Sequence, residues 1–183
     1  MRILTIIILH VAILFGCSKK IENKEIVFKK IQTSDSNWKF YSQFDVKLYC
    51  PIGFEIKSDS FLLDRLQIYK NSRYDSSMYD FSIKITKTIK AYKIDNQSFD
   101  ENFVELSKMI LEQQNITKCA TDKVVISGLK GYRLSAMTSL LNKMDSTFIY
   151  ILNGNKFDYL IVRDGMEKYR LMGDSLICML DLK

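Results

Sequence analysis

The chain has 183 residues, 47% of them apolar, and its 27 lysines and arginines outnumber 21 acidic residues for a net charge of +6. This length and apolar content suffice for one domain with a real core. The positive excess is modest and spread along the chain, which excludes the clustered basic face of a nucleic-acid-binding protein.

The first predicted element is an apolar stretch from Ile3 to Phe15, interrupted only by Thr5 and His10. Thirteen residues are too few for a membrane-spanning helix, which needs about 20. They suit the apolar region of a signal peptide, and the preceding Arg2 supplies its positive end.

The stretch ends in Leu14-Phe15-Gly16-Cys17. This sequence resembles a bacterial lipobox, with an aliphatic residue at −3, a small residue at −1 and then the cysteine. The resemblance implies that the chain is cut before Cys17, that the Cys17 sulfur is lipidated and that the new amino group is acylated. The alternative is an uncleaved anchor with an incidental cysteine.

Cleavage would also change the composition of the chain. His10 is the only histidine, so a mature chain of 167 residues has none, which excludes mechanisms and metal sites that use imidazole. Loss of Arg2 leaves a net charge of +5. The lysines after the cysteine either lie near acidic headgroups, each contributing up to about 1 kcal/mol to membrane binding, or form a solvated linker; they are Lys19, Lys20, Lys24, Lys29 and Lys30.

Three segments follow from this interpretation. Residues 1–16 are the signal peptide, residues 17–37 are a lipidated N-terminus and tether that can add an edge strand, and residues 38–183 are the folded domain. Alternating apolar residues predict strands around Phe44–Leu48, Leu66–Ile68 and Tyr79–Ile85.

The second half of the chain carries the helix signals. Ser98-Phe99-Asp100-Glu101 forms a capping box before a helix with apolar residues at helical spacing. Further strands are predicted at Val124–Ile126, Tyr132–Ala136, Phe148–Leu152 and Phe157–Ile161, and Asn153-Gly154 predicts a hairpin between the last two. A final helix is predicted from Met166 to Leu180, with Tyr169, Met172, Leu176 and Leu180 on its apolar face.

Three cysteines would remain after cleavage, Cys50, Cys119 and Cys178. An exported protein can keep disulfides, and a Cys50–Cys119 bridge would stabilise the fold by roughly 4 kcal/mol in the chain-entropy model. The odd count favours buried thiols for at least one of them. Cys178 points away from the core on the helical wheel and is the cysteine expected to be most accessible.

The order of these elements resembles the PsbP-like and Mog-like families. "FDVKLYCPIGFEI" (44–56), "SGLKGYRLSA" (127–136) and "FIYILNGNKFDYLIV" (148–162) carry the likeness. It implies an α+β sandwich: an antiparallel sheet of about 6–7 strands with two main helices packed on it. These families serve mostly as accessory and protein-binding domains. No partner-binding residue is carried over, because no motif matches.

Chemical motifs are otherwise scarce. Ser127-Gly128-Leu129-Lys130 matches S-x-x-K, but it lies between glycines in a turn and its partner elements are missing. No metal or cofactor motif is present, so neither is expected. Arg73, Tyr74 and Tyr79 are a candidate contact patch, since tyrosine and arginine are enriched at interface hot spots.

Together these observations predict a non-catalytic, lipid-anchored protein of the bacterial cell envelope, on the periplasmic side of the outer membrane, with a protein partner and no nucleic acid. The alternatives are a small-ligand carrier, a hydrolase that works without histidine, and an immunity or inhibitor lipoprotein. A deep pocket with paired carboxylates or a Ser–Lys pair would favour the enzyme.

Overall fold

The computed structural model describes residues 22–29, 36–60, 64–71, 79–88, 90, 98–101, 103–105, 118–140 and 143–182, and among these it leaves out the side chains of 22–24, 118–119, 136–140 and 143–146. Strands dominate this part of the chain. They are β1 (Glu22–Phe28), β2 (Trp38–Gln43), β3 (Val46–Pro51), β4 (Glu55–Asp59), β5 (Arg65–Asn71), β6 (Tyr79–Thr88), β7 (Lys118–Ile126), β8 (Leu129–Leu140), β9 (Lys143–Asn153), β10 (Asp158–Gly165) and β11 (Asp181–Leu182).

Helices are few in the described part. A 3-10 turn, η2 (Glu167–Tyr169), leads into the helix α3 (Arg170–Cys178), and residues 99–101 and 103–105 are also helical. Among the described residues, no helix combines the length and the apolar character that a membrane crossing requires.

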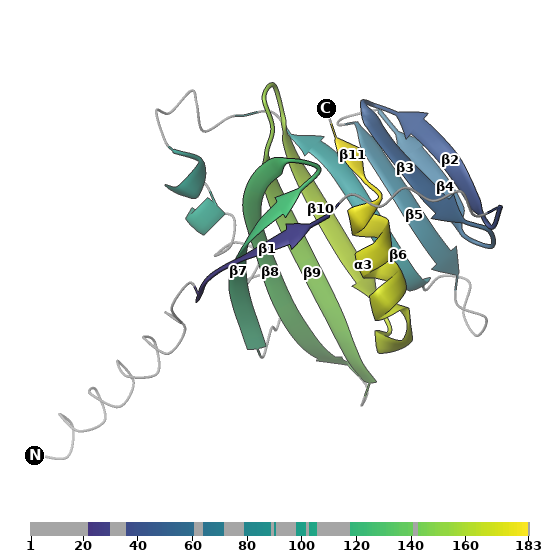
Figure 1. The fold of residues 1–183 in the computed structure, drawn as a ribbon. Coiled ribbons are helices and arrows are strands. Elements are labelled where there is room, and N and C mark those ends of the chain that lie inside the picture. The colour runs from purple at the N-terminus through teal and green to yellow at the C-terminus, as the bar shows by residue number, and fades with distance from the viewer. Residues whose placement is uncertain are drawn as a thin grey trace, which may run out of the picture.

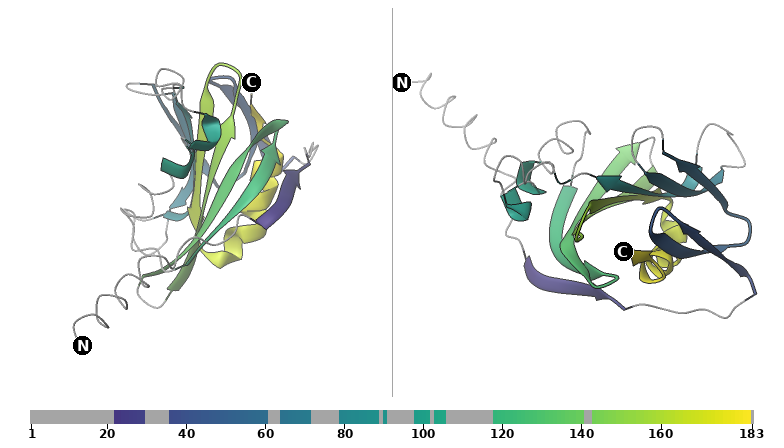
Figure 2. Two further views of the ribbon diagram at one scale, coloured as in Figure 1. Left: turned by 90° about the vertical axis from the view of Figure 1, so that its left-hand side faces the viewer. Right: turned by 90° about the horizontal axis from the view of Figure 1, so that it is seen from above.

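The strands form two sheets. The large sheet has eight strands in the order β1-β7-β8-β9-β10-β6-β5-β4, and the small sheet has three in the order β11-β3-β2. The large sheet curves around α3 and the small sheet, while the helical residues 99–101 and 103–105 lie on its other side (Figures 1 and 2). The chain is therefore layered, with the large sheet in the middle.

The predicted α+β fold class is wrong. Instead of an antiparallel sheet of six or seven strands under two main helices, the described chain is mostly β, with eleven strands, a mixed large sheet and only short helical elements. The large sheet is mixed because β1 pairs parallel to β7, with Ile26 beside Val124. This pairing also gives the tether the edge strand that its sequence allowed.

Most internal strands follow the predicted alternation. In β3, Val46, Leu48 and Cys50 are buried and the residues between them are not. The hairpin after Asn153 is confirmed, with β9 ending there and β10 beginning at Asp158. Its turn needs Gly154, since a Cβ there would overlap the carbonyl of Phe157.

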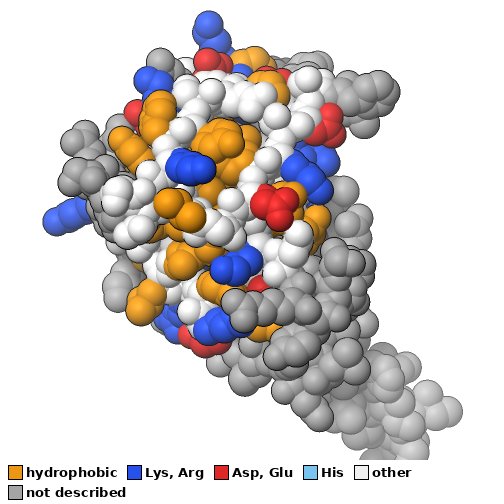
Figure 3. All heavy atoms as spheres, turned by 90° about the vertical axis from the view of Figure 1, so that its right-hand side faces the viewer, with side chains coloured by type: hydrophobic (Ala, Val, Ile, Leu, Met, Phe, Trp, Pro, Cys, Tyr) orange, Lys and Arg blue, Asp and Glu red, His pale blue; other side chains and the backbone are white. Residues whose placement is uncertain are grey.

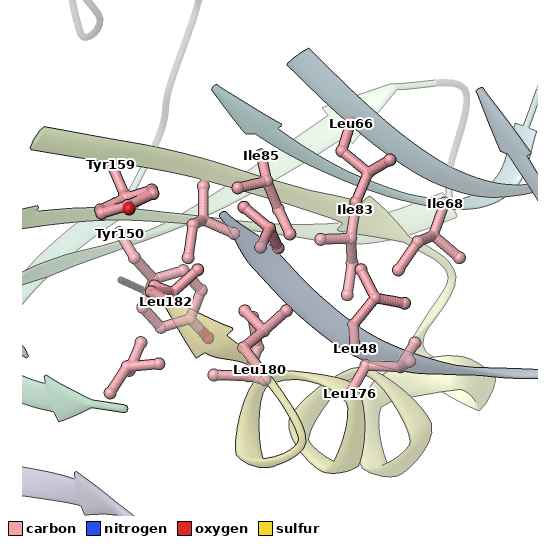
Figure 4. Close-up of a cluster of buried hydrophobic side chains, with 14 of the residues drawn as sticks. Leu48, Leu66, Ile68, Ile83, Ile85, Tyr150, Tyr159, Leu176, Leu180 and Leu182 are labelled. Atoms are coloured by element: carbon pink, nitrogen blue, oxygen red, sulfur yellow. The ribbon is translucent and has the colours of Figure 1, made fainter. Parts of the chain in front are cut away.

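Two apolar clusters cover the two faces of the large sheet. Under α3, the side chains labelled in Figure 4 point from both sheets toward Leu176 and Leu180. On the opposite face, Phe103 packs on Tyr132, Leu134, Ile149 and Ile151. A sheet buried on both faces explains why residues 148–152 read as a nearly continuous apolar run.

The predicted capping box is present. The Glu101 amide donates to Ser98 Oγ at 3.2 Å, and the Ser98 amide donates to Glu101 Oε2 at 2.6 Å. These bonds hold the pKa of Glu101 below its ordinary value. The continuation of this helix beyond residue 105 lies outside the described residues.

The terminal helix is shorter than predicted, but its apolar face is correct. Leu176 and Leu180 are buried, and Tyr169 and Met172 pack against the same core. The prediction began at Met166; the structure has a 3-10 turn first and then α3.

Candidate functional site

The residues predicted to matter are only partly within the described chain. Cys17, Arg73 and Tyr74 lie outside it. Tyr79 is 45% exposed and packs on the ring of Tyr69, with the ring centroids 5.0 Å apart. The patch of Arg73, Tyr74 and Tyr79 therefore stays a prediction.

The structure describes the side chains of two cysteines, Cys50 and Cys178, and both are free thiols. Cys50 is a free, buried thiol whose pKa is raised to about 11 by burial. The Cys119 side chain is outside the described set, so the Cys50–Cys119 bridge remains a prediction without structural support. Cys178 is partly exposed, more so than Cys50, and burial raises the pKa of its thiol too.

Ser127 makes a structural contact in the turn that carries the S-x-x-K match. It adopts a left-handed conformation with φ 54° in the turn between β7 and β8. Its Oγ accepts a hydrogen bond from the Leu182 amide at 3.0 Å, which ties this turn to β11.

An open groove lies at the β1 side of the large sheet, on the face that carries the helical residues. Its volume is about 450 Å³. Five separate segments line it, through Glu25, Ser98, Phe99, Asp100, Lys123, Val124, Lys130, Gly131, Tyr132 and Asn153.

Stacked aromatic rings form one wall of the groove. The Tyr132 ring lies nearly parallel to the rings of Phe99 and Phe103, with interplanar angles of 15° and 20° and centroid distances of 6.1 Å and 4.2 Å. The Tyr132 hydroxyl donates to Asp100 Oδ1 at 2.8 Å. Burial and the neighbouring Asp100 raise the pKa of Tyr132 to about 12, so the hydroxyl keeps its proton at neutral pH. This contact fixes the Asp100 carboxylate at the groove.

A buried ion pair lies behind the other end of the groove. Lys90 Nζ donates to Asn153 Oδ1 at 2.6 Å and is 3.1 Å from Asp158 Oδ1. Lys90 and Asp158 are 8% and 5% exposed. Removing either charged side chain would leave the other charge buried and unpaired. The hydrogen bond from Lys90 holds the side chain of Asn153, which lines the groove.

The polar side chains of the groove already have partners in part. In the described lining, Ser98 caps a helix and Asp100 accepts from Tyr132, so neither forms a nucleophile–base pair. No group of three or more His, Cys, Asp or Glu side chains that could hold a metal occurs within the described residues. The groove instead offers exposed lysines, two carboxylates and an aromatic wall.

Sequence reasoning missed the groove as a site. The capping box located Ser98 and Asp100, but Glu25, Lys123 and Asn153 come together only through the sheet order. The parallel pairing that places Glu25 beside Lys123 has no signal in the sequence, because the two residues lie far apart along the chain.

A second exposed surface covers the small sheet and the turn after it. Phe40 and Ile52 are large apolar side chains exposed there, and the ring centroids of Phe40 and its cross-strand partner Tyr49 lie 5.4 Å apart. Figure 3 shows this face, where hydrophobic side chains gather near the middle with lysines and arginines between them. We call Phe40, Tyr49 and Ile52 the aromatic face.

No protein-family model matches the chain, and no curated protein sequence matches it. Among solved structures, the cyanobacterial PsbP (CyanoP) from Synechocystis sp. PCC 6803 aligns with a TM-score of 0.51 at 10% identity, over 81% of this chain and 94% of that one. The chain thus has a PsbP-like fold.

Two further structures align with lower scores. A crystal structure from Bacteroides thetaiotaomicron VPI-5482 has a TM-score of 0.47 at 10% identity over 76% of this chain, which spans 45% of that one. A protein of unknown function from Pseudomonas aeruginosa has a TM-score of 0.48 at 9% identity, over 80% of this chain and 98% of that one.

Proposed function

We propose that this chain is a lipid-anchored, non-catalytic accessory domain of the bacterial cell envelope, held on the periplasmic side of the outer membrane, that binds a protein partner. The observation that carries the proposal is Leu14-Phe15-Gly16-Cys17 at the end of a thirteen-residue apolar stretch. A lipidated and acylated Cys17 carries more than one acyl chain, which stable anchoring requires.

The position of β1 supports a close attachment. β1 begins at Glu22, five residues after Cys17. An extended chain covers at most about 3.5 Å per residue, so five residues reach about 17 Å. An anchor at Cys17 would therefore keep the domain beside the bilayer.

The aromatic face supports a protein partner. Aromatic side chains concentrate binding energy at interfaces, and the face presents Phe40 and Ile52 at 56% and 58% exposure. The groove, with no nucleophile–base pair in its described lining, supports binding in preference to catalysis.

The anchor is tested by palmitate labelling and by the size of the product. We expect Cys17→Ala to abolish both labelling and cleavage before residue 17, and globomycin to leave a labelled but uncleaved precursor, while the control Cys178→Ala is labelled and cleaved normally. If Cys17→Ala is still labelled, or is still cleaved before residue 17, the anchor is refuted.

The partner surface is tested by crosslinking in envelope fractions. Benzoylphenylalanine replaces Phe40 in the aromatic face or, as a matched control, Phe157, which is also exposed. We expect a discrete protein adduct from position 40 and none from position 157. The same adducts from both positions, or none from position 40, would contradict binding at this face.

A further inference from the structure

The groove lies close to the proposed attachment point. Glu25 lines it and stands eight residues after Cys17. Eight residues span at most about 28 Å, so the groove cannot lie farther than that from Cys17. If Cys17 is lipidated, as proposed above, phospholipid headgroups are the most concentrated small molecules around the groove. The source of the ligand rests on that anchoring, whereas the ligand chemistry rests on the groove itself.

The lining combines two positive and two negative groups. Lys123 and Lys130 are exposed, and neither has an ion-pair partner in the described part of the chain. Glu25 and Asp100 bring carboxylates to the same groove. Lysine ammonium groups bind phosphate oxygens through charge-assisted hydrogen bonds, and carboxylates bind ammonium groups in the same way. A ligand that carries both a phosphate and an ammonium group can pair with the two lysines and with the two carboxylates.

The wall beside Asp100 favours an organic ammonium group. Phe99 stacks nearly parallel on Tyr132 and stands next to the carboxylate that Tyr132 holds. A cation near Asp100 would therefore meet both a negative charge and an aromatic face, which attracts cations. The volume of about 450 Å³ lies in the range of small-molecule sites, roughly 300–1,000 Å³.

We propose that this groove binds the headgroup of a zwitterionic membrane phospholipid, a phosphate diester that carries a primary ammonium group. The phosphate lies against Lys123 and Lys130. The ammonium group lies between Asp100, Glu25 and the Phe99 ring.

The chemistry is tested with water-soluble headgroups on the purified, processed protein in neutral detergent. Calorimetric titration with glycerophosphoethanolamine should give saturable binding, and glycerophosphoglycerol should bind about tenfold more weakly, a difference of about 1.4 kcal/mol. Lys123→Gln with Lys130→Gln should weaken binding about tenfold. The control pair Lys39→Gln with Lys47→Gln removes the same charge from the small sheet and should leave binding unchanged. Equal affinity for both headgroups, or an equal loss in both double variants, overturns the assignment.

Asp100→Asn provides an independent variant. The asparagine side-chain oxygen still accepts the Tyr132 hydrogen bond, so the fold is preserved while the negative charge is lost. Its preference for glycerophosphoethanolamine over glycerophosphoglycerol should fall. An unchanged preference overturns the placement of the ammonium group.

The membrane source is tested in vesicles with equal amounts of phosphatidylethanolamine and phosphatidylglycerol. Benzoylphenylalanine at Phe99 should give mainly phosphatidylethanolamine adducts, and equal adducts or none refute the lipid source. Flotation of the same vesicles reports the anchor separately. Intact flotation without headgroup binding refutes the groove proposal alone, and headgroup binding without flotation refutes the anchor alone.

Discussion

A single buried side chain, Arg163 of β10, connects the large sheet to α3. Arg163 is 3% exposed, and its guanidinium pairs with Asp174 and donates to the Arg170 carbonyl at 3.1 Å. It also lies over the Phe148 ring, 4.6 Å from the centroid. Gly173 leaves the space for it, since a Cβ there would overlap the guanidinium.

We therefore expect Gly173→Ala to lower the free energy of unfolding by about 1–2 kcal/mol, because overpacking outweighs the gain of about 1 kcal/mol in helix propensity. Leu171→Ala on the exposed side of α3 should change it by less than about 0.5 kcal/mol. Urea denaturation measures both. A Gly173→Ala protein as stable as the unaltered one would show that Arg163 can move aside.

Tyr132 makes stability depend on pH in the alkaline range. Its pKa is about 12 in the folded protein and about 10 in an unfolded chain. The folded state thus holds the proton more tightly, so its contribution is complete below pH 10 and is lost as pH rises toward 12. Between pH 9 and 11, the free energy of unfolding should fall by about 1 kcal/mol more in the unaltered protein than in Tyr132→Phe. Parallel pH profiles of the two proteins would contradict this.

β1 is the element that extends the fold beyond the predicted domain. Phe28 is half-buried and meets the Tyr150 ring edge-on at 5.9 Å, whereas Val27 next to it is exposed. Phe28→Ala should reduce the free energy of unfolding by about 2 kcal/mol, and Val27→Ala by less than about 0.5 kcal/mol. Equal small losses would mean that β1 adds little to stability.

Elements were predictable where local chemistry determines them. The capping box at Ser98 and the hairpin at Asn153 depend on neighbouring residues, and both are present. β4 was missed because it is an edge strand whose side chains are nearly all exposed, so it needs no apolar alternation. β4 is held in the sheet by its backbone pairing with β5 and not by buried apolar side chains.

At the scale of the whole molecule, the sequence indicated the order of the main strands and the PsbP-like likeness but overestimated the helices. Apolar clusters cover both faces of the large sheet. An apolar residue in one of its strands therefore does not show which layer, helix or second sheet, packs on it. The groove was not predictable because Glu25, Asp100 and Lys130 meet only after β1, β7 and β8 are assembled.

The parallel pairing of β1 with β7 also constrains the order in which the protein can fold. Ile26 and its partner Val124 are about 100 residues apart in the chain, and contacts this distant form slowly because a long loop must close first. The hairpins from β7 to β10 need no such closure. During synthesis β1 leaves the ribosome before every other strand, yet it cannot take its place until β7 exists, so the first strand to be made completes the sheet.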